Sequence, residues 1–513
     1  MQKNRSVGIM ISYAGIIVNM ISGLVLSAFL LRALGDVEYG LYQSVFAFAG
    51  YLILLEFGTG TVMARNISVC LNTEDEAGRK ELLDRNYSTI WVISLILSCA
   101  MILVGGVFYW TLDKIYAVTM TPAQIAYARR MILLMIGFII AGYLTQNISG
   151  FLLAQQEYTF SKLLALIRIV VRTVLLIVVI SISRYAIHIA AIDLILNLAV
   201  FLISLWYCRK EYRVKFSLRY FDRAIFRASI PMCVALLLQA LTNQANNNVD
   251  KFLISIMMSM ENVALYSIVQ YIFTMFSSVA TVPVSMFLPE ISRTMAGHPD
   301  ALELTRSLVR PCRLTVIFCG SLLFGFIAVG RQFISVFYGA DKVDAWVYTL
   351  IILVPAFVNL TDSVVISVMD VANKRLARSL VLFGSTAVNI ILTIILMRYW
   401  EIYGAVIATA FALVVGEIII LNLYYQKVLH IRVLLLFREA YRGLLPYQIL
   451  AGAAVFFLAG RIENPLASML VGGVAYLAVS FGLIWFFGLN ESETARVRAW
   501  MKKLRLAGGK GQK

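Results

Sequence analysis

Apolar runs of membrane-spanning length follow one another along the chain, separated by short polar segments. A transmembrane helix needs about 20 predominantly apolar residues, and fourteen runs approach or exceed that length. They lie near 7–31, 40–64, 87–110, 130–153, 163–183, 187–208, 229–258, 262–288, 311–337, 345–369, 379–399, 403–425, 444–460 and 466–489. The pattern predicts an all-α polytopic membrane protein with about 14 transmembrane helices.

The seventh run, 229–258, differs from the others because its middle is polar. Spacings of three and four residues place several of its polar side chains on one helical face. They are Gln239, Asn243, Asn246 or Asn247, and Asp250. Such groups are costly in hydrocarbon and normally face a bundle interior or a water-filled cavity. We expect this run to open the second half of the protein and to line a hydrophilic cavity; a polar seam between packed helices is the alternative.

Two pairs of segments reveal an internal repeat. GLYQSV at 40–45 matches ALYSIV at 264–269, and LTQNISGFLLAQQEYTFSK at 144–162 matches LTDSVVISVMDVANKRLARS at 360–379. Six spans separate the partners, so the halves share one orientation. The repeat predicts two parallel six-helix lobes around a central cavity, a transporter arrangement, followed by two C-terminal helices. The expected boundaries are 1–215, 216–430, and 431–513 with a basic tail.

Basic residues gather on one side of the predicted spans. With the N-terminus inside, 32 of the 44 lysines and arginines fall in inner segments, nine in outer segments and three within spans. This bias predicts a multi-pass membrane protein with both termini cytoplasmic. The net charge of +16 is therefore mainly a topology signal, and we expect contact with the phospholipid membrane and none with nucleic acid.

Composition removes several classes of function. The chain is 61% hydrophobic, only 14% charged, and its mean hydropathy is +0.84, which excludes a soluble enzyme. The three histidines show no metal-ligand spacing and no cysteine pair forms a CxxC, so neither a metal nor a disulfide framework is expected. There is no phosphate-binding loop motif. We expect no cofactor, and an ion gradient or substrate exchange as the energy source.

Motifs in two regions carry a resemblance to a known family. The stretch 29–68 contains Arg32, Leu-Gly, Tyr-Gly-Leu-Tyr, Glu-Phe-Gly and Arg65, and 246–292 contains Asp-Lys, a tyrosine and a Pro-Glu-Ile-Ser ending. Both stretches resemble bacterial polysaccharide repeat-unit flippases of the multidrug/oligosaccharidyl-lipid/polysaccharide superfamily. The sequence departs from that family at Glu56, where aspartate is usual, and at the turn 259–262, where glycine is common.

The resemblance implies a non-enzymatic function. Members of that family flip undecaprenyl-pyrophosphate-linked oligosaccharide repeat units across the cytoplasmic membrane for O-antigen, capsule or exopolysaccharide assembly. A polymerase and glycosyltransferases are the partners it suggests. The physical need is clear, because a sugar and a pyrophosphate cannot cross hydrocarbon without a polar path.

Two arginines lie inside the fifth predicted span. Arg168 and Arg172 are four residues apart and share a helical face. Arginine binds phosphate oxygens in a bidentate manner, so both are candidates for gripping the pyrophosphate. A structural pair of Arg172 with Asp193 or Glu56, or snorkelling to the inner surface, is the alternative. Arg65, at the end of the second span, is a candidate for the inner mouth or a topology anchor.

Hydroxyl and amide groups complete the candidate binding path. In the eighth span a polar stripe contains Gln270 and Thr274, and in the seventh Asn243 and Asn247 face the same way. These groups suit sugar hydroxyls, although serine and threonine also permit close helix packing.

Acidic residues within spans are candidates for coupling transport to an ion. They are Asp250, Asp193 and Asp362, with Glu417 as a fourth intramembrane carboxylate. Each could bind a proton or Na⁺, or could neutralise one of the arginines.

Other functions remain open at this stage. A multidrug or organic-cation antiporter of the same superfamily would be expected to have a net acidic cavity, and a lipid II flippase would handle a similar pyrophosphate lipid. A membrane glycan polymerase or ligase would be expected to need a large outer loop with catalytic groups. The longest predicted outer loop, 111–128, contains only Asp113 and Lys114 as charged residues.

Overall fold

The computed structural model describes residues 2–71, 76–212, 214, 216–297, 299–372, 374–490 and 493–494. Within these ranges the chain forms helices and no β-strand, as expected where a bilayer cannot satisfy free backbone groups. The α-helices are α1 Gln2–Leu34, α2 Asp36–Leu52, α3 Thr59–Leu71, α4 Glu76–Ile115, α5 Pro122–Ala154, α6 Tyr158–Ile182, α7 Ile187–Tyr212, α8 Arg223–Met257, α9 Met260–Ala296, α10 Ala301–Phe337, α11 Ala345–Thr361, α12 Val365–Val371, α13 Arg375–Ala412, α14 Leu421–Val428, α15 Val433–Tyr441, α16 Leu445–Ala459 and α17 Pro465–Leu483. Short 3₁₀ segments are η1 Ile53–Glu56, η2 Leu218–Tyr220 and η3 Ala340–Lys342, and π-helical segments are η4 Leu413–Ile420 and η5 Ile484–Gly488.

The helices confirm a polytopic all-α membrane protein. Among the described residues, nine helical stretches are long and apolar enough to cross a membrane, or eleven if each of two bent pairs forms one span. All fourteen predicted runs fall on helices. This number is lower than fourteen partly because α8 is too polar to count as a membrane span. In addition, residues 377–428 count as one helical stretch, although Glu401 interrupts it with non-helical backbone angles. The count of fourteen stays a prediction.

The chain divides into two compact units. The first contains Met1–Ile268 and Met397–Ala405, and the second contains Val269–Leu396 and Val406–Lys513. Helix α8 thus belongs to the first unit, where it packs on α2, α3 and α4. In the sequence repeat, α8 opens the second half. The lobe boundaries expected from the repeat stay a prediction.

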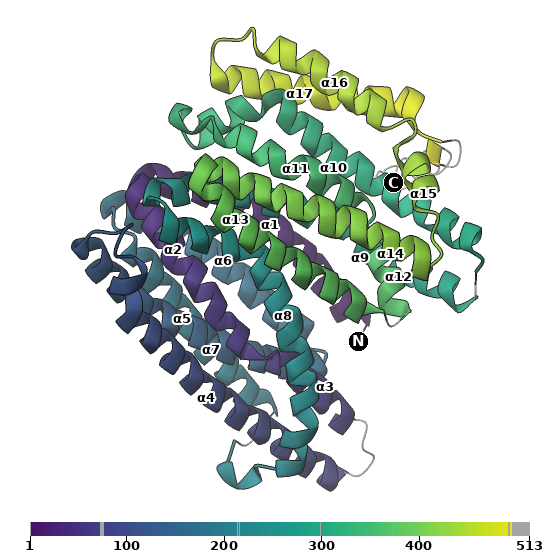
Figure 1. Ribbon diagram of the computed structural model, residues 1–513. Helices are drawn as coiled ribbons and strands as arrows, with labels where there is room; N and C mark the ends of the chain where they lie inside the picture. Colours follow the sequence, from purple (N-terminus) through teal and green to yellow (C-terminus); the bar gives the residue numbers. More distant parts are fainter. Residues whose placement is uncertain are drawn as a thin grey trace, which may run out of the picture. The chain divides into compact units, whose positions relative to one another are not determined.

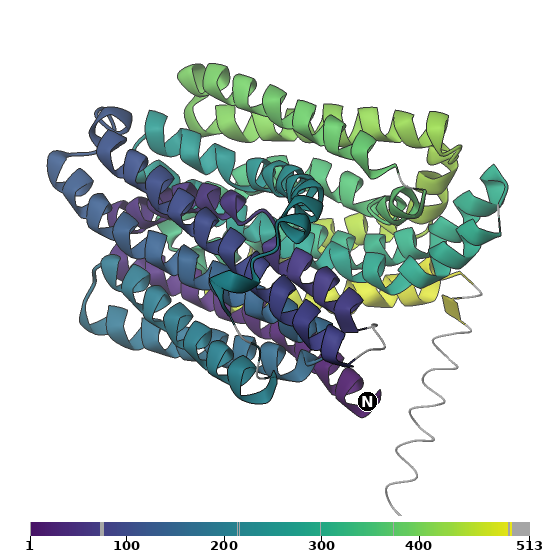
Figure 2. The ribbon, with the colours of Figure 1, turned by 90° about the horizontal axis from the view of Figure 1, so that it is seen from below.

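Close packing of α4, α5 and α7 builds the first unit, as Figure 1 shows and the view from below in Figure 2 agrees. Glycines bring α3 and α5 into contact: a Cβ atom on Gly150 would overlap the carbonyl oxygen of Gly60. Thr121 caps α5 in a capping box with Gln124, and Pro122 occupies the first turn, a typical helix start. These contacts fix the helices that surround the candidate site.

In the second unit α10, α16 and α17 lie side by side (Figure 1). The buried Arg313 on α10 is only 2% exposed. Its five N–H donors all have acceptors, because they bond the Glu493 carboxylate and the backbone carbonyls of Glu439, Arg442 and Gly488 at 2.8–3.1 Å. A buried guanidinium is tolerated when every donor is matched, so Arg313 joins α10 to the segments that flank α16 and α17.

Candidate functional site

Two adjoining hollows lie within the first unit. The larger has a volume of about 600 Å³ and the smaller about 300 Å³, within the usual range for ligand sites. They share five lining residues from the second span, α5 and α6. These are Ile53, Glu56, Ser149, Ser161 and Ala165. The larger hollow adds Gln146, Glu157 and Lys162, and the smaller adds Thr145, Arg168 and Asn197.

A break in the second span places Glu56 at these hollows. Helix α2 ends at Leu52, a 3₁₀ turn follows, and α3 begins at Thr59. Between them Phe57 and Gly58 have left-handed backbone angles, with φ of 50° and 62°. A Cβ atom on Gly58 would lie 2.6 Å from the Leu236 side chain of α8, so glycine suits this position both in conformation and in space. Strained breaks of this kind concentrate at functional sites.

Glu56 is half-buried at the end of the 3₁₀ turn. Within the described part of the chain it forms neither a hydrogen bond nor an ion pair. A carboxylate inside a membrane domain normally has a partner or faces a polar path. Besides Glu157, the larger hollow therefore contains an acidic group, Glu56, whose neighbours leave it available to a ligand.

Arg172 lies four residues beyond Arg168 on α6 and forms an ion pair with α7. Its Nε and Nη2 donate to the two carboxylate oxygens of Asp193 on α7, at 2.5 and 2.8 Å. Asp193 is only 4% exposed, whereas the Arg172 side chain is 28% exposed, so the pair is bidentate and partly buried. The structural pairing with Asp193, which the sequence left open, is the arrangement present here; its use in substrate binding stays a prediction.

Arg168 differs from Arg172 although both share one face of α6. Arg168 is half-buried and lines the smaller hollow. Its buried Nε has no hydrogen-bond partner among the described residues. An arginine with free donors at a polar hollow can accept an anionic oxygen without first giving up a protein partner. Of the two arginines of α6, Arg168 lines one of the two hollows and Arg172 is not among the lining residues.

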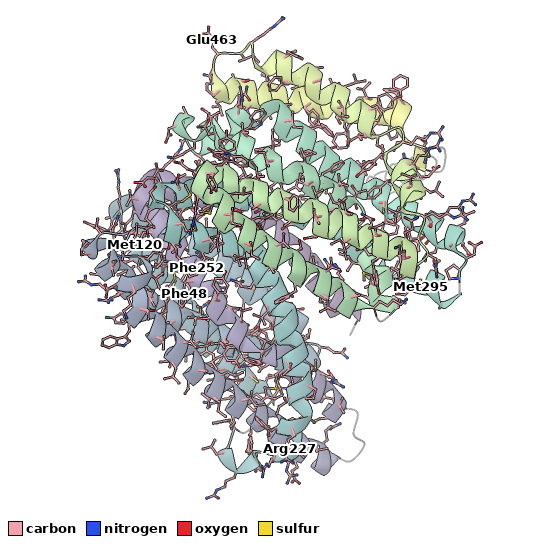
Figure 3. All side chains as sticks on the ribbon, in the orientation of Figure 1. Phe48, Met120, Arg227, Phe252, Met295 and Glu463 are labelled. Atoms are coloured by element: carbon pink, nitrogen blue, oxygen red, sulfur yellow. The ribbon has the colours of Figure 1, made fainter. Side chains whose placement is uncertain are left out.

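The remaining predicted binding residues of the first unit lie on α3 and α8. Arg65 is exposed on α3, and its Nη1 donates to the thioether sulfur of Met232 at 3.3 Å. A thioether is a weak acceptor, so most of the hydrogen-bonding capacity of Arg65 is left for other groups. The backbones of Asn243 and Asn247 are helical within α8, but their side chains lie outside the described residues, and their proposed role stays a prediction. Figure 3 marks Arg227 and Phe252 toward the two ends of α8.

Gln270 and Thr274 belong to the second unit. The Thr274 hydroxyl is exposed and donates to the backbone carbonyl of Gln270 at 2.8 Å. This bond uses the hydroxyl hydrogen and leaves its lone pairs, so Thr274 can still accept a hydrogen bond. Neither residue is among those that line the two hollows.

The three predicted coupling carboxylates are in different surroundings. Asp193 is held by Arg172. Asp250 is 6% exposed and accepts a hydrogen bond from the Tyr266 hydroxyl at 2.8 Å, while the adjacent Lys251 reaches Gln43 at 3.4 Å. Asp362 lies in the second unit, 3% exposed, with one carboxylate oxygen that has no partner among the described residues. No group of three or more His, Cys, Asp or Glu side chains suited to a metal occurs in the searched, described residues.

Sequence reasoning gave Glu56 no place among the binding residues. The signal was present in the run Glu-Phe-Gly-Thr-Gly at 56–60, where an acidic residue and two glycines interrupt an apolar span. Glycine pairs of this kind indicate a break. The position of Glu56 at the hollows also depends on the packing of α8 against Gly58, and the sequence alone does not show this contact.

The arrangement is suited to a polar, mixed-charge ligand. Lys162 and Arg168 supply cationic donors, Glu56 supplies an acceptor, and Ser149 and Ser161 supply hydroxyls. The buried Ser161 hydroxyl has no hydrogen-bond partner among the described residues. Groups of this kind bind sugar hydroxyls and phosphate oxygens, and nothing in the set resembles a nucleophile with an adjacent base.

Comparison with known proteins identifies the sequence and fold relatives. The profile of the family described as polysaccharide biosynthesis protein matches residues 7–295, more than half of the chain. No curated protein sequence matches. Among solved structures, the lipid II flippase MurJ in an inward closed conformation has a TM-score of 0.69 at 14% identity, covering 93% of this chain and 98% of its own.

Two MATE transporters show the same fold. An inward-facing multidrug resistance MATE family transporter of the MOP superfamily has a TM-score of 0.63 at 14% identity, covering 82% of this chain and 96% of its own. A mutant form of the Vibrio cholerae MATE transporter VcmN has a TM-score of 0.51 at 15% identity, covering 84% of this chain and 99% of its own. At these identities the likeness concerns the fold alone.

Proposed function

Because the chain belongs to the family of polysaccharide biosynthesis proteins, we propose that it is a flippase for undecaprenyl-pyrophosphate-linked oligosaccharide repeat units. It moves them from the cytoplasmic to the outer leaflet of the bacterial cytoplasmic membrane, for O-antigen, capsule or exopolysaccharide assembly. Transport is by alternating access driven by an ion gradient. The observation that carries the proposal is the two adjoining hollows at the broken second span, which share Glu56 and are lined by Lys162 and Arg168 respectively.

The hollow offers distinct groups for the two polar parts of such a lipid. Arg168 and Lys162, with Arg65 on α3, supply positive charge for the pyrophosphate, and arginine does so with a planar fork that matches phosphate oxygens. Glu56, Ser149 and Ser161 supply acceptors and hydroxyls for the sugars. The polyprenyl chain stays in the bilayer, so the protein need shield only the headgroup from hydrocarbon.

Topology is part of the proposal. Both termini face the cytoplasm, as the asymmetry of basic residues indicates. Cysteine labelling tests it: Thr494→Cys is expected to be shielded from an impermeant outside reagent, while Glu463→Cys, in the loop that joins α16 and α17 (Figure 3), is expected to react. Labelling of Thr494→Cys in intact cells would show that the C-terminus faces outside, which is the opposite of the proposed orientation.

The main experiment measures lipid-linked repeat units in the two leaflets. Removing the protein from cells that make a surface polysaccharide is expected to trap repeat units in the cytoplasmic leaflet, because synthesis is upstream and continues. Wild-type protein restores export, and Arg168→Ala restores much less at equal membrane level. Arg184→Ala is the matched control, since Arg184 is exposed outside the helices. Normal export without the protein would refute the proposal, and accumulation of lipid II alone would favour a lipid II flippase.

An organic-cation antiporter is the second candidate. The unpaired Glu56 favours it, because an acidic group in a hollow attracts cations. Two observations weigh against it: Arg168 and Lys162 line the same hollows, and the family match is to polysaccharide biosynthesis. Efflux of a cationic dye from cells, abolished by Glu56→Gln with unchanged polysaccharide export, would support the antiporter instead.

The proposed function implies two kinds of partner protein. A polymerase would consume the flipped repeat unit on the outer face, and glycosyltransferases would supply it on the inner face. The chain itself then performs no covalent chemistry. Copurification of a polymerase with the full-length protein, from cells that express both, tests whether this relation includes a direct contact.

A further inference from the structure

An apolar groove lies on the first unit, beside the break in the second span. Its volume is about 210 Å³, which is below the usual range for sites that enclose a whole small molecule. Its lining consists of aliphatic and aromatic side chains and one cysteine: Phe57, Ile93, Ile96, Leu97, Phe226, Ile230, Cys233 and Val234. The groove therefore suits one segment of an apolar chain, and its lining offers nothing to a charged or hydroxylated ligand.

Helices α4 and α8 form two walls of this groove. On α8 the spacing of four places Phe226, Ile230 and Val234 on one helical face, and the lining positions of α4 are likewise spaced by three and four. The two faces meet because α4 packs against α8. Ile96 is 58% exposed and continues a row of exposed apolar side chains along α4 that includes Leu103. Since such a row on a spanning helix faces lipid, the groove opens to the bilayer.

Phe57 joins the groove to the larger polar hollow. Its side chain lines both, and the hollow also contains Glu56 and Lys162. Helix α8 runs past the two sites, with Val234 at the groove and Leu236 at the hollow. An apolar site and a polar site thus share one wall within the first unit. A molecule with a polar head and an apolar chain fits this arrangement.

The Phe57 ring is fixed between the two sites. Its backbone has a φ of 50°, in the left-handed region where a bulky residue is uncommon. The ring packs, together with Leu236, against the buried cluster of the first unit that contains Met63 and Phe151. Strained residues concentrate at functional sites. Phe57 is therefore a rigid divider and not a mobile side chain that could fill either space.

The surroundings of the groove limit which chain it selects. Bilayer hydrocarbon is as apolar as the groove, so burial there brings no hydrophobic gain, and only packing favours a bound chain. Close packing distinguishes a methyl-branched chain from a straight one by its shape. A lipid whose chain lies in the groove and whose head lies in the hollow passes one ring as a single chain, whereas a phospholipid carries two chains. Both properties favour the single, methyl-branched chain of a polyprenyl lipid.

The groove lies toward the end of α4 and α8 that the proposed topology assigns to the cytoplasm. At this end Arg85 of α4 pairs with Asp222 at the start of α8, at 3.6 Å, and the Asp222 amide donates to the Thr89 hydroxyl at 3.0 Å. Ile96 follows Thr89 by about 10 Å along the helix. A chain that lies in the cytoplasmic leaflet, where the proposed substrate is made, therefore has a short path to the groove.

We propose that this groove binds the first isoprenoid units of the polyprenyl chain, next to the pyrophosphate, while the headgroup occupies the larger hollow on the other side of Phe57. The inference rests on the proposed function and deepens it, since it assigns a protein site to one part of the chain and leaves the rest in the bilayer. A chain fixed beside Phe57 sets the depth at which the substrate lies and directs the pyrophosphate into the hollow that contains Lys162.

The test uses purified full-length protein in lipid nanodiscs, with a photoreactive benzophenone amino acid in place of Ile96. The probe is radiolabelled undecaprenyl phosphate, which has the chain and a phosphate but no sugar. The control carries the same photoreactive group in place of Leu103, which is 71% exposed on α4 and is not among the lining residues. We expect at least tenfold more label at position 96 than at position 103, and loss of this excess when unlabelled undecaprenyl phosphate is added.

A second probe distinguishes the polyprenyl chain from other lipids. Radiolabelled phosphatidic acid carries a terminal phosphate on two straight chains, and we expect it to label positions 96 and 103 equally. Equal labelling of the two positions by undecaprenyl phosphate, or a preference for position 96 that phosphatidic acid shares, would overturn the site.

Filling the groove provides an independent measurement. Ile230→Trp places a larger ring at an exposed lining position and is expected to reduce the undecaprenyl phosphate label at position 96 at least fivefold, whereas Leu103→Trp leaves it unchanged. Undiminished labelling in a folded Ile230→Trp protein would contradict the proposal. The comparison of the two probes needs no tryptophan, so it still decides the outcome if Ile230→Trp fails to fold.

These outcomes are separable from those of the proposed function. Preferential labelling of position 96 by undecaprenyl phosphate, with no effect of the protein on glycan export, would leave the chain site in place and remove the flippase. Glycan export without that preference would keep the flippase and refute the groove as a site for its chain.

Discussion

Asp193 and Asp362 are buried to nearly the same degree, 4% and 3% exposed, but their surroundings are opposite. In the first unit both oxygens of Asp193 are occupied by the fork of Arg172. In the second unit Asp362 lies in a broken span, with Oδ2 unmatched in the described residues. A carboxylate with both oxygens bonded has little capacity left for a ligand, whereas one with an unbonded oxygen can still accept a hydrogen bond or a cation. Burial alone therefore does not distinguish the two surroundings.

The two arginines of α6 repeat this contrast within one helix. Arg172 donates from Nε and Nη2 to both oxygens of Asp193, while the Nε of Arg168, at the smaller hollow, has no partner among the described residues. One turn of helix separates them, so the difference comes from what α7 places opposite each position. The following substitutions test whether charged residues with a protein partner and charged residues without one also differ in function.

The largest effect is expected at the matched pair. Arg172→Ala leaves Asp193 buried without its partner, and breaking a buried pair costs about 3–5 kcal/mol. We expect a strong fall in membrane-inserted, folded protein, measured by detergent-resistant monodispersity and by the unfolding midpoint. Neutralising both residues, as Arg172→Met with Asp193→Leu, is expected to recover folding. A well-inserted Arg172→Ala protein that exports nothing would instead make Arg172 a headgroup ligand.

A smaller stability effect and a larger functional one are expected at the unmatched arginine. Losing a hydrogen bond to a charged group is worth about 1.5–3 kcal/mol, which corresponds to roughly 10- to 100-fold in affinity. Arg168→Ala is therefore expected to insert normally but to export poorly, and Arg168→Lys to be partly active because charge remains without the fork. Export per inserted protein is the measurement. Unchanged export by Arg168→Ala would remove Arg168 from the binding path.

The break that exposes Glu56 is tested by adding one methyl group. Gly58→Ala forces alanine to a φ near 62° and places Cβ against Leu236, and a left-handed non-glycine residue costs about 1–2 kcal/mol. We expect a lower unfolding midpoint and reduced export, with partial recovery when Leu236→Ala is added. Gly106→Ala is the control, since nothing lies within 4 Å of its Cβ position. Equal midpoints for the two variants would contradict the strained break.

The smallest effect is expected at Asp250. Asparagine keeps an oxygen that accepts from Tyr266, so Asp250→Asn should change the free energy of unfolding by less than about 0.5 kcal/mol. Transport rates are to be measured across Na⁺ concentration and pH. An altered ion dependence in Asp250→Asn, with an unaltered one in Asp362→Asn, would favour Asp250 as the coupling group.

Much of the fold could be read from the sequence because the bilayer restricts the choices. Long apolar runs can only become helices there, and all fourteen predicted runs fall on helices. The family was also accessible, since the motifs around Glu56 and Arg65 are local in sequence and the family match begins at residue 7. The sequence could not predict that α8 groups with the first unit. The internal repeat assigns α8 to the second half of the chain, whereas its unit is decided by its packing against α2, α3 and α4.

What the sequence determined by itself was the helical membrane class, the family and the set of charged residues inside the spans. Hydropathy and motifs are local properties of the sequence, so they can be recognised without any knowledge of tertiary contacts. Which charges are matched was decided only in three dimensions. Arg172 and Asp193 meet because α6 and α7 pack together. Asp362, at the bend between α11 and α12, and Asn422, just after the π-helix, each keep an oxygen that has no partner among the described residues. Partner choice depends on distances between helices, and those are set by packing.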